Sequence, residues 1–355
     1  MLWLIGLGIE GLGGMSLKSR EILKKCNIIY IERFTGYLSD IDLSELKLCV
    51  KNRDNVLHVV GRLFVEDGRD ILEQAVKDNV ALMVYGDALI ATTHIELFVR
   101  AMKRGIKVEV VHSASGITSL IGESGLQIYK FGRSSTIMSD HNSAISVYNT
   151  LLDNLLLGNH TLILTEYSET KENMTPFFLD PNVAMKMLLN VENDYRSRAF
   201  TKETFVLVAS RIGRADKKVV SGHVRSLLEI DHGAGPHSLI VPGRLHFVEK
   251  EAISSITSVV DEPNENSVHV TRTSTRMVQK YVPSVKKDVN ELRKRLSVDS
   301  TLYKGISTVL DNAEYYIQDA EKFLNQGKNE LAVLSVGYAE GLIDAILFQK
   351  GFDPS

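Results

Sequence analysis

Short runs of apolar residues alternate with stretches in which apolar residues recur every three or four positions. The runs are of strand length, and each ends in glycine, polar or turn-forming residues, as buried strands do. They cover residues 2–8, 27–32, 80–86, 107–115, 160–166, 204–210 and 237–243. Helical spacing marks residues 15–26, where Ser16 is a candidate N-cap, and residues 93–105, where Gly105 ends the pattern. This alternation predicts an α/β fold with largely parallel sheets.

The pattern changes after about Ile253. Residues 261–277 contain few large apolar side chains and many turn-forming residues, which is typical of a linker or a loosely held segment. We therefore expect residues 256–275 to connect two parts of the chain.

Beyond this segment only helical spacing remains. Apolar residues follow three- and four-residue steps across 302–324 and 331–346, with a break at Asn325-Gln326-Gly327, and a weaker pattern covers 285–296. We expect residues 276–355 to form a small all-helical domain whose apolar stripes are packing faces.

Composition and charge exclude several classes of protein. The 355 residues carry a formal net charge of −3, which argues against a nucleic-acid binder with a strong basic field. Cys26 and Cys49 form no Cys-x-x-Cys pair and the histidines lack metal-ligand spacing, so we expect no metal site. Continuous apolar runs are only of strand length, and no basic flank precedes the first. We expect neither a membrane span nor a signal peptide, and hence a cytoplasmic protein.

Glycines follow the first predicted strand in a Gly-x-Gly-x-x-Gly spacing. Gly6, Gly8 and Gly11, with Glu32 at the end of the second strand, match a dinucleotide-binding fingerprint and its acidic residue about 20 positions on. A dinucleotide site also requires the next helix to begin at the last glycine, so that its N-terminus faces the pyrophosphate. The candidate cap, Ser16, comes about five residues later. The glycines therefore fit either a dinucleotide or another ligand that approaches the main chain closely.

Unusual residues gather at the ends of the predicted strands, where ligands bind in α/β folds. They lie at 6–11, 86–87, 113–116, 165–166 and 209–210. Asp87 can accept hydrogen bonds from a hydroxyl or ammonium group of a ligand. A Gly-Asp step also commonly closes a turn, and both interpretations of Asp87 stay open.

Four blocks of sequence together point to a family. They read "IGLGIEGLGGMSLKSREILKKCNIIYIERFT", "GDALIATTH", "HSASGITSLIGESGLQIYKFGRSSTI" and "GPHSLIVPGRLHFVE". In this order they resemble the diphthine synthase family, which belongs to the tetrapyrrole-methylase-like class of S-adenosylmethionine-dependent methyltransferases. The resemblance covers roughly residues 1–255. The tail, roughly residues 275–355, resembles a small archaeal domain of unknown function, which indicates an archaeal fusion.

The resemblance implies two α/β subdomains, residues 1–112 and 113–255, with S-adenosylmethionine folded in the cleft between them. It implies methylation of the amino group of a modified histidine on translation elongation factor 2, by three transfers in archaeal members, and a homodimer. Residues at the matching motif positions are expected to contact the cofactor. These are Ile9, Glu10, Asp87, Ile90, Ser115, Gly116, Thr165, Ala209 and His237.

Two departures from the family pattern affect these assignments. Ala88 stands where the family commonly has proline after the aspartate, and residues 168–182 form a longer stretch than usual. The longer stretch weakens the placement of Thr165 and Ala209. His237 can contact the cofactor or satisfy the backbone of its own loop, and both interpretations stay open.

Methyl transfer from a sulfonium to an amine requires alignment and exclusion of water rather than a nucleophile of the protein. We therefore expect no catalytic triad. Glu166 is the candidate for assisting proton loss from the amine; a solvated loop carboxylate is the alternative. Two other functions stay open: a methyltransferase of the same class acting on a corrin or porphyrin precursor, and an NAD-dependent oxidoreductase.

Overall fold

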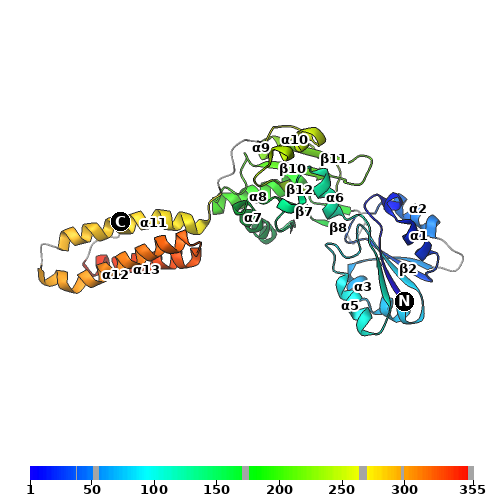
Figure 1. Ribbon diagram of the computed structural model, residues 1–355, viewed down its shortest axis with the longest axis horizontal. Coiled ribbons are helices and arrows are strands. Elements are labelled where there is room, and N and C mark those ends of the chain that lie inside the picture. The colour runs from blue at the N-terminus through cyan, green and yellow to red at the C-terminus, as the bar shows by residue number, and fades with distance from the viewer. Residues whose placement is uncertain (37, 51–55, 170–175, 264–269, 297–299, 351–355) are drawn as a thin grey trace. The chain divides into compact units, whose positions relative to one another are not determined.

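The computed structural model describes residues 1–36, 38–50, 56–169, 176–263, 270–296 and 300–350. These residues form two compact units (Figure 1). The first, the α/β unit, comprises Met1–Asp194 and Ala199–Val268. The second, the helical unit, comprises Tyr195–Arg198 and His269–Ser355.

The first sheet of the α/β unit is parallel throughout, with strand order β3-β2-β4-β1-β5. Its strands are β1 (Leu2–Gly6), β2 (Ile28–Glu32), β3 (Val56–Val60), β4 (Val80–Val84) and β5 (Val108–Val111). Its helices are α1 (Leu17–Leu23), α2 (Asp40–Val50), α3 (Arg62–Asp67), α4 (Arg69–Lys77) and α5 (Ile95–Lys103). This half of the unit confirms the parallel α/β prediction.

Alternate residues of β4 face two separate hydrophobic cores. Leu82 packs with α4 and α5, and Met83 packs with α1 and α2. Every residue of β4 is buried, because helices cover both faces of the sheet (Figure 1). This explains why the strand reads as a continuous apolar run.

The second sheet is mixed, and here the expectation of largely parallel sheets is wrong. Its strand order is β13-β11-β10-β12-β7-β6. The pairs β10·β11, β10·β12 and β7·β12 are antiparallel, whereas β6·β7 and β11·β13 are parallel. The strands are β6 (Ser135–Ile137), β7 (Thr161–Thr165), β10 (Phe205–Ser210), β11 (Lys218–His223), β12 (His237–Val241) and β13 (Ser258–Val259).

A short connection accounts for one antiparallel pair, β10·β11. A parallel neighbour requires a crossover of a dozen or more residues, usually a helix. Only residues 211–217 separate β10 from β11. The next connection, which contains the short helix α9 (Val224–Leu227), takes the chain past β10, so β12 pairs with the other side of β10 and runs in the same direction as β11. An apolar run by itself does not indicate the direction of its neighbour, so the sequence pattern missed this reversal.

The remaining elements of the α/β unit complete the second sheet. Helices α6 and α10 pack on one face through Leu120 and Ile253, and Figure 1 shows α7 and α8 on the other side. Strands β8 and β9 form a separate antiparallel pair. The bounds are α6 (Gly116–Glu123), α7 (His141–Leu156), β8 (Tyr167–Glu169), β9 (Pro176–Phe178), α8 (Pro181–Tyr195) and α10 (Phe247–Ile256).

Part of the segment predicted as a linker belongs to this sheet. Strand β13 pairs with β11, and the Asp261 carboxylate accepts a hydrogen bond from the His223 amide at 2.9 Å. Two-residue strands carry too few side chains to show a period, which is why the pattern missed β13. Residues 264–269 lie outside the described residues.

The helical unit is a three-helix bundle, as the apolar stripes predict. Its helices are α11 (Thr273–Leu296), α12 (Ser300–Asn325) and α13 (Asn329–Lys350). Val285, Ile317 and Val336, one from each helix, belong to its core. Helix α11 begins well before the predicted residue 285 and contains Pro283.

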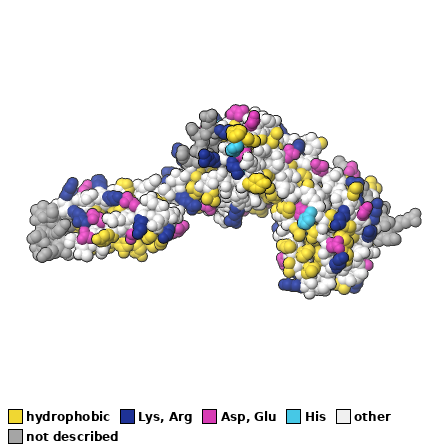
Figure 2. All heavy atoms as spheres, viewed as in Figure 1, with side chains coloured by type: hydrophobic (Ala, Val, Ile, Leu, Met, Phe, Trp, Pro, Cys, Tyr) yellow, Lys and Arg dark blue, Asp and Glu magenta, His cyan; other side chains and the backbone are white. Residues whose placement is uncertain are grey.

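Helix α13 is apolar on more than one face. Asn329–Gln349 is long and apolar enough to cross a membrane by length and composition, which differs from the expectation of strand-length runs only. Ala339 and Ile343 face the bundle core, whereas Leu334 and Tyr338 are exposed. Figure 2 shows hydrophobic side chains gathered on the surface of this unit.

Candidate functional site

Three loops at the carboxyl ends of first-sheet strands meet at one edge. Gly8 and Gly86 exchange backbone hydrogen bonds of 3.0 and 2.9 Å, which joins the loop after β1 to the loop after β4. A Cβ at Gly6 would lie 2.7 Å from the Gly86 oxygen and 3.0 Å from the Ser113 Cβ. Glycine is therefore required at position 6, because the three backbones approach so closely.

Asp87 holds two of these loops together. Its side chain is 1% exposed and accepts hydrogen bonds from the Leu89 amide at 2.9 Å, the Ser113 amide at 3.1 Å and His112 Nδ1 at 2.9 Å. Burial opposes ionisation of this carboxyl, but these hydrogen bonds outweigh it and lower the pKa of Asp87. Asp87 is thus a buried, ionised carboxylate at the sheet edge, and its bond to the Leu89 amide also closes the turn.

The glycine-rich loop does not open directly into a helix. Residues Gly11–Gly14 form a 3-10 turn, and α1 begins only after Ser16, whose hydroxyl accepts from the Ser19 amide at 3.1 Å. The late helix start predicted from the sequence is confirmed. The helix N-terminus is therefore not placed at the last glycine, as a pyrophosphate site requires.

Glu32, the acidic residue of the apparent fingerprint, is fully buried. Its carboxylate accepts from the amides of Phe34 at 2.8 Å, Thr35 at 3.0 Å and Tyr85 at 3.3 Å. Burial is the largest influence and raises the pKa of Glu32. Through these bonds the carboxylate joins the loop after β2 to the residue after β4. The carboxylate is therefore turned toward the protein backbone and not toward a ribose.

A second group lies at one edge of the second sheet. Because β7 and β10 both run antiparallel to β12, their last residues lie beside its first residue, His237. Thr165 donates to the His237 carbonyl at 2.7 Å, and the Ser210 hydroxyl lies 2.8 Å from His237 Nδ1. Burial, the main cause, lowers the pKa of His237 to about 4, so its ring is neutral at physiological pH.

Contacts around Ile9 connect the two halves of the α/β unit. A Cβ at Gly213, whose φ is +86°, would lie 2.6 Å from both Ile9 Cγ1 and the Ile9 carbonyl oxygen. Tyr85 donates its hydroxyl to that same oxygen at 3.0 Å. Arg214 reaches Asp42 at 3.1 Å. The loop after β10 therefore closes against the glycine loop, and glycine is required at position 213.

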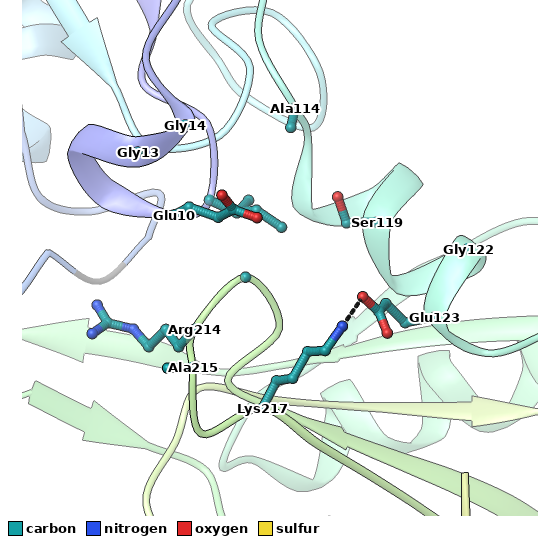
Figure 3. Close-up of a pocket in the computed structure, with 12 residues that line it drawn as sticks. Glu10, Gly13, Gly14, Ala114, Ser119, Gly122, Glu123, Arg214, Ala215 and Lys217 are labelled. Carbon is teal, nitrogen blue, oxygen red and sulfur yellow. Dashed lines mark hydrogen bonds and ion pairs between the residues drawn. The ribbon is translucent and has the colours of Figure 1, made fainter. Parts of the chain in front are cut away.

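A cavity of about 750 Å³ lies between these loops (Figure 3). Figure 3 shows Glu10 facing the loop of Arg214 and Lys217, and Lys217 paired with Glu123. The volume falls within the roughly 300–1,000 Å³ typical of ligand pockets. Its lining residues are Ile9, Glu10, Gly13, Gly14, Ala114, Ser119, Gly122, Glu123, Gly213, Arg214, Ala215 and Lys217.

The structure places the predicted site residues in three groups. Ile9 and Glu10 line the cavity. Asp87, Ser115 and Gly116 lie in the adjoining loops; Ser115 caps α6 through a bond from the Ile117 amide at 3.2 Å, and Ile90 is 43% exposed on the loop after β4. Thr165, Ala209 and His237 form the group at the second sheet.

Glu166 accepts hydrogen bonds at one oxygen, Oε2, from the Ser139 amide at 2.8 Å and the Ser139 hydroxyl at 2.5 Å. It is therefore tied to the loop after β6. Among the described residues, Glu166 is not part of the cavity lining.

The sequence prediction placed Ser210 at a strand end without giving it a role, and it missed the polar cavity residues Ser119, Glu123, Arg214 and Lys217. For Ser210, the alternation of residues along the strand indicates the direction in which its side chain points. Ala209 packs into the core with Leu207, and successive strand residues face opposite sides, so Ser210 must face the other way, toward His237. Arg214 and Lys217 lie on a loop without periodicity, and no sequence pattern marks them.

Comparison with known families matches two separate parts of the chain, one almost entirely within the α/β unit and one within the helical unit. Residues 1–228 match the tetrapyrrole (corrin/porphyrin) methylases, and residues 280–352 match a protein family of unknown function, DUF357. The first match covers the strands and loops of the cavity; the second covers most of the helical unit.

Individual relatives identify a smaller family within the class that the first match gives. The diphthine synthase of Methanocaldococcus jannaschii is 32% identical over 256 residues, which are 71% of this chain and 97% of that protein. The diphthine synthase of Methanothermobacter thermautotrophicus is 33% identical over 258 residues, 72% of this chain and 95% of that protein. The diphthine methyl ester synthase of Dictyostelium discoideum is 32% identical over 265 residues, 71% of this chain and 96% of that protein.

Solved structures agree with these relatives. A crystal structure from Entamoeba histolytica, assigned to diphthine synthase, superposes with a TM-score of 0.64 at 32% identity and covers 72% of this chain and 98% of that one. A second diphthine synthase structure, at 23% identity and a TM-score of 0.63, covers 73% of this chain and 97% of that one and shows the shared fold. The chain therefore belongs to the diphthine synthases, a family of methyltransferases within the tetrapyrrole methylases.

Proposed function

We propose that this protein transfers methyl groups from S-adenosylmethionine to the amino group of a modified histidine on elongation factor 2, in the cytoplasm. Three successive transfers then give diphthine. Identity of about a third to diphthine synthases over nearly their whole length carries this proposal. The late helix start and the buried Glu32 argue against the NAD-dependent alternative.

The cavity fits this cofactor in chemical kind. S-adenosylmethionine carries a cationic sulfonium, an ammonium, a carboxylate and an adenine ring. The cavity lining offers the Glu10 carboxylate for a cationic group, Arg214 and Lys217 for an anionic one, and Ile9 and Ala114 for apolar contact. Opposite charges spaced around one pocket suit a ligand that itself carries both signs.

Nine residues would hold the cofactor in this proposal, as the family motif implies. Ile9 and Glu10 line the cavity, Asp87 fixes the loops that present Ile90, Ser115 and Gly116, and Thr165 with Ala209 and His237 completes the second-sheet side. When bound, the cofactor supplies the methyl group. The protein aligns donor and acceptor, and the neutral ring of His237 can donate or accept a hydrogen bond there without adding charge.

The test supplies the full chain with labelled S-adenosylmethionine and elongation factor 2 that carries the unmethylated histidine precursor. We expect label in the factor, and mass spectrometry should count three added methyl groups. The matched control is a factor whose acceptor histidine is replaced by glutamine, which should stay unlabelled. Light scattering on the same preparation tests the homodimer that the family leads us to propose.

Binding measurements separate this proposal from its alternatives. S-adenosylhomocysteine should raise the melting temperature of the protein, and NAD should not. Stabilisation by S-adenosylhomocysteine without label in the factor would favour a methyltransferase acting on a corrin or porphyrin precursor. Stabilisation by NAD alone would overturn the methyltransferase assignment.

A further inference from the structure

His112 stands at the point where β5 ends and the loop toward α6 begins. Its side chain is 68% exposed, while the Asp87 side chain that it contacts is 1% exposed. The bond joins His112 Nδ1 to Asp87 Oδ2 at 2.9 Å. One end of the imidazole is therefore held by a buried group, and the other end faces outward.

The partners of Asp87 show which nitrogen of His112 carries a proton. Its oxygens accept from the amides of Leu89 and Ser113, so the carboxylate is an acceptor and His112 Nδ1 must be the donor. A neutral imidazole carries a single N–H. In the neutral ring Nδ1 therefore carries this proton and Nε2 keeps its lone pair, on the side of the ring away from Asp87.

We propose that His112 is the general base of the methyl transfer, accepting at Nε2 the proton of the substrate ammonium, and that Asp87 is its positioning residue. This inference rests on the proposed function. In each step an N–H bond of the ammonium breaks, its electron pair remains on the substrate nitrogen, and an Nε2–H bond forms. The exposed ring then passes the proton to water before the next transfer.

The reaction requires such a step before every transfer. An alkyl ammonium has no lone pair to attack a methyl group, and a nitrogen that has gained one or two methyl groups is again protonated near neutral pH. A histidine is suited to this exchange because a neutral imidazole has one ring nitrogen with a free lone pair that can accept a proton. After a third transfer no N–H bond remains, so no base is needed.

His112 begins the loop that contributes Ala114 to the cavity lining, whereas the Glu166 carboxylate is bonded to Ser139. His112 is two residues before Ala114, which lines the cavity, and three before Ser115. The pairing with Asp87 fixes the imidazole as the third group of a catalytic triad fixes its histidine. Within the described residues, Asp87 is the charged side chain that the structure places against the ring.

The test compares His112→Ala with wild type in single-turnover methyl transfer to elongation factor 2, at several pH values, with and without added imidazole. We expect the rate of the variant to fall about 100-fold near pH 7. The rate should recover in part as the pH rises toward the pKa of the substrate ammonium, because the amine then loses its proton without a base. Added imidazole should also restore the rate. Affinity for S-adenosylhomocysteine should stay within about twofold. The matched control is His58→Ala, an exposed histidine on β3, which should change none of these values.

A second measurement does not depend on activity. Nitrogen NMR of the free wild-type protein, with the resonance assigned through its loss in His112→Ala, should show neutral His112 protonated at Nδ1. An Nε2–H tautomer would contradict the proposal. So would a variant whose rate is unchanged, or whose lost rate is not restored by imidazole or high pH. If wild type binds S-adenosylhomocysteine but never labels the factor, the proposed function fails first.

Discussion

The two sheets of the α/β unit differ in where their buried carboxyl groups lie. In the first sheet they lie at the strand ends that face the candidate site, and in the second sheet at the strand ends away from it. In the first sheet, Glu32 and Asp87 lie at the carboxyl ends of β2 and β4, where the site loops meet. In the second sheet, buried Glu249 contacts His160 at the start of β7, whereas Thr165 ends that strand beside His237. The three side chains that meet there, Thr165, Ser210 and His237, are neutral.

This difference separates two uses of a buried negative charge. Glu249 accepts from the amides of Gln127 and His246, from His160 and from Lys130. Burial opposes its ionisation, but these bonds outweigh it and lower the pKa of Glu249 to about 2. It fixes α10 and the loop before β7, and it is not part of the cavity lining. Asp87 performs a similar structural task at the site itself and also orients His112.

The largest expected effect is on stability. Glu249→Ala leaves several buried donors and the Lys130 charge without their acceptor, and we expect the free energy of unfolding to fall by about 3–5 kcal/mol. Denaturant unfolding measures this loss. The folded fraction should bind S-adenosylhomocysteine with unchanged affinity. Weakened binding in that fraction, or in the milder Glu249→Gln variant, would contradict the division between the two carboxylates.

Asp87→Ala should affect both stability and activity. The amides of Leu89 and Ser113 lose their acceptor, which costs about 1–3 kcal/mol, and His112 loses its orientation. We expect methyl transfer to fall about 100-fold at saturating cofactor, beyond what the folded fraction explains. Single-turnover rates corrected for unfolded protein provide the check. Full activity in the folded fraction would show that Asp87, like Glu249, has only a structural role.

The two halves should also lose stability together in mild acid. Burial, the main cause for each, lowers the pKa of His94 in the first half and of His237 in the second to about 4, from 6.5. The unfolded chain takes up these protons first, so this contribution is complete above pH 6.5 and is lost as the pH falls toward 4. We expect each histidine to account for about 2 kcal/mol between pH 7 and pH 5.

Unfolding free energies at the two pH values, for His94→Gln and His237→Gln separately, test this pH dependence. Each variant should flatten the pH dependence by a similar amount. If only one variant does so, the acid sensitivity belongs to one half of the unit.

The smallest effect is expected at the neutral Ser210–His237 pair. Ser210→Ala removes the hydroxyl beside His237 Nδ1, which should cost about 0.5–1.5 kcal/mol of stability and several-fold in affinity for S-adenosylhomocysteine. The matched control is Ser221→Ala, a buried serine of the same sheet whose hydroxyl bonds Thr257 at 2.7 Å. Calorimetric titration should show lower affinity in the first variant only. Equal affinities would show that the Ser210–His237 pair is structural.

The pattern of apolar residues predicted the strands that carry the site, because buried strands and amphipathic helices leave different periods in the sequence. It also predicted the late start of α1, since Ser16 is a side chain that caps a helix locally. It did not predict the direction of strand neighbours in the second sheet, nor the strand β13. These depend on which elements pair, and pairing partners far apart in the chain leave no local period.

The sequence by itself determined the α/β and helical units, the glycines that three converging backbones require, and the family through its four blocks. Only the tertiary structure decided that the Glu32 carboxylate accepts hydrogen bonds from the loop that follows it. It also decided that Ser210 rather than Ala209 contacts His237, and that Asp87 binds Nδ1 of His112. Local propensity acts between neighbours in the chain. The protonation and orientation of a buried side chain depend instead on donors that folding brings from distant segments.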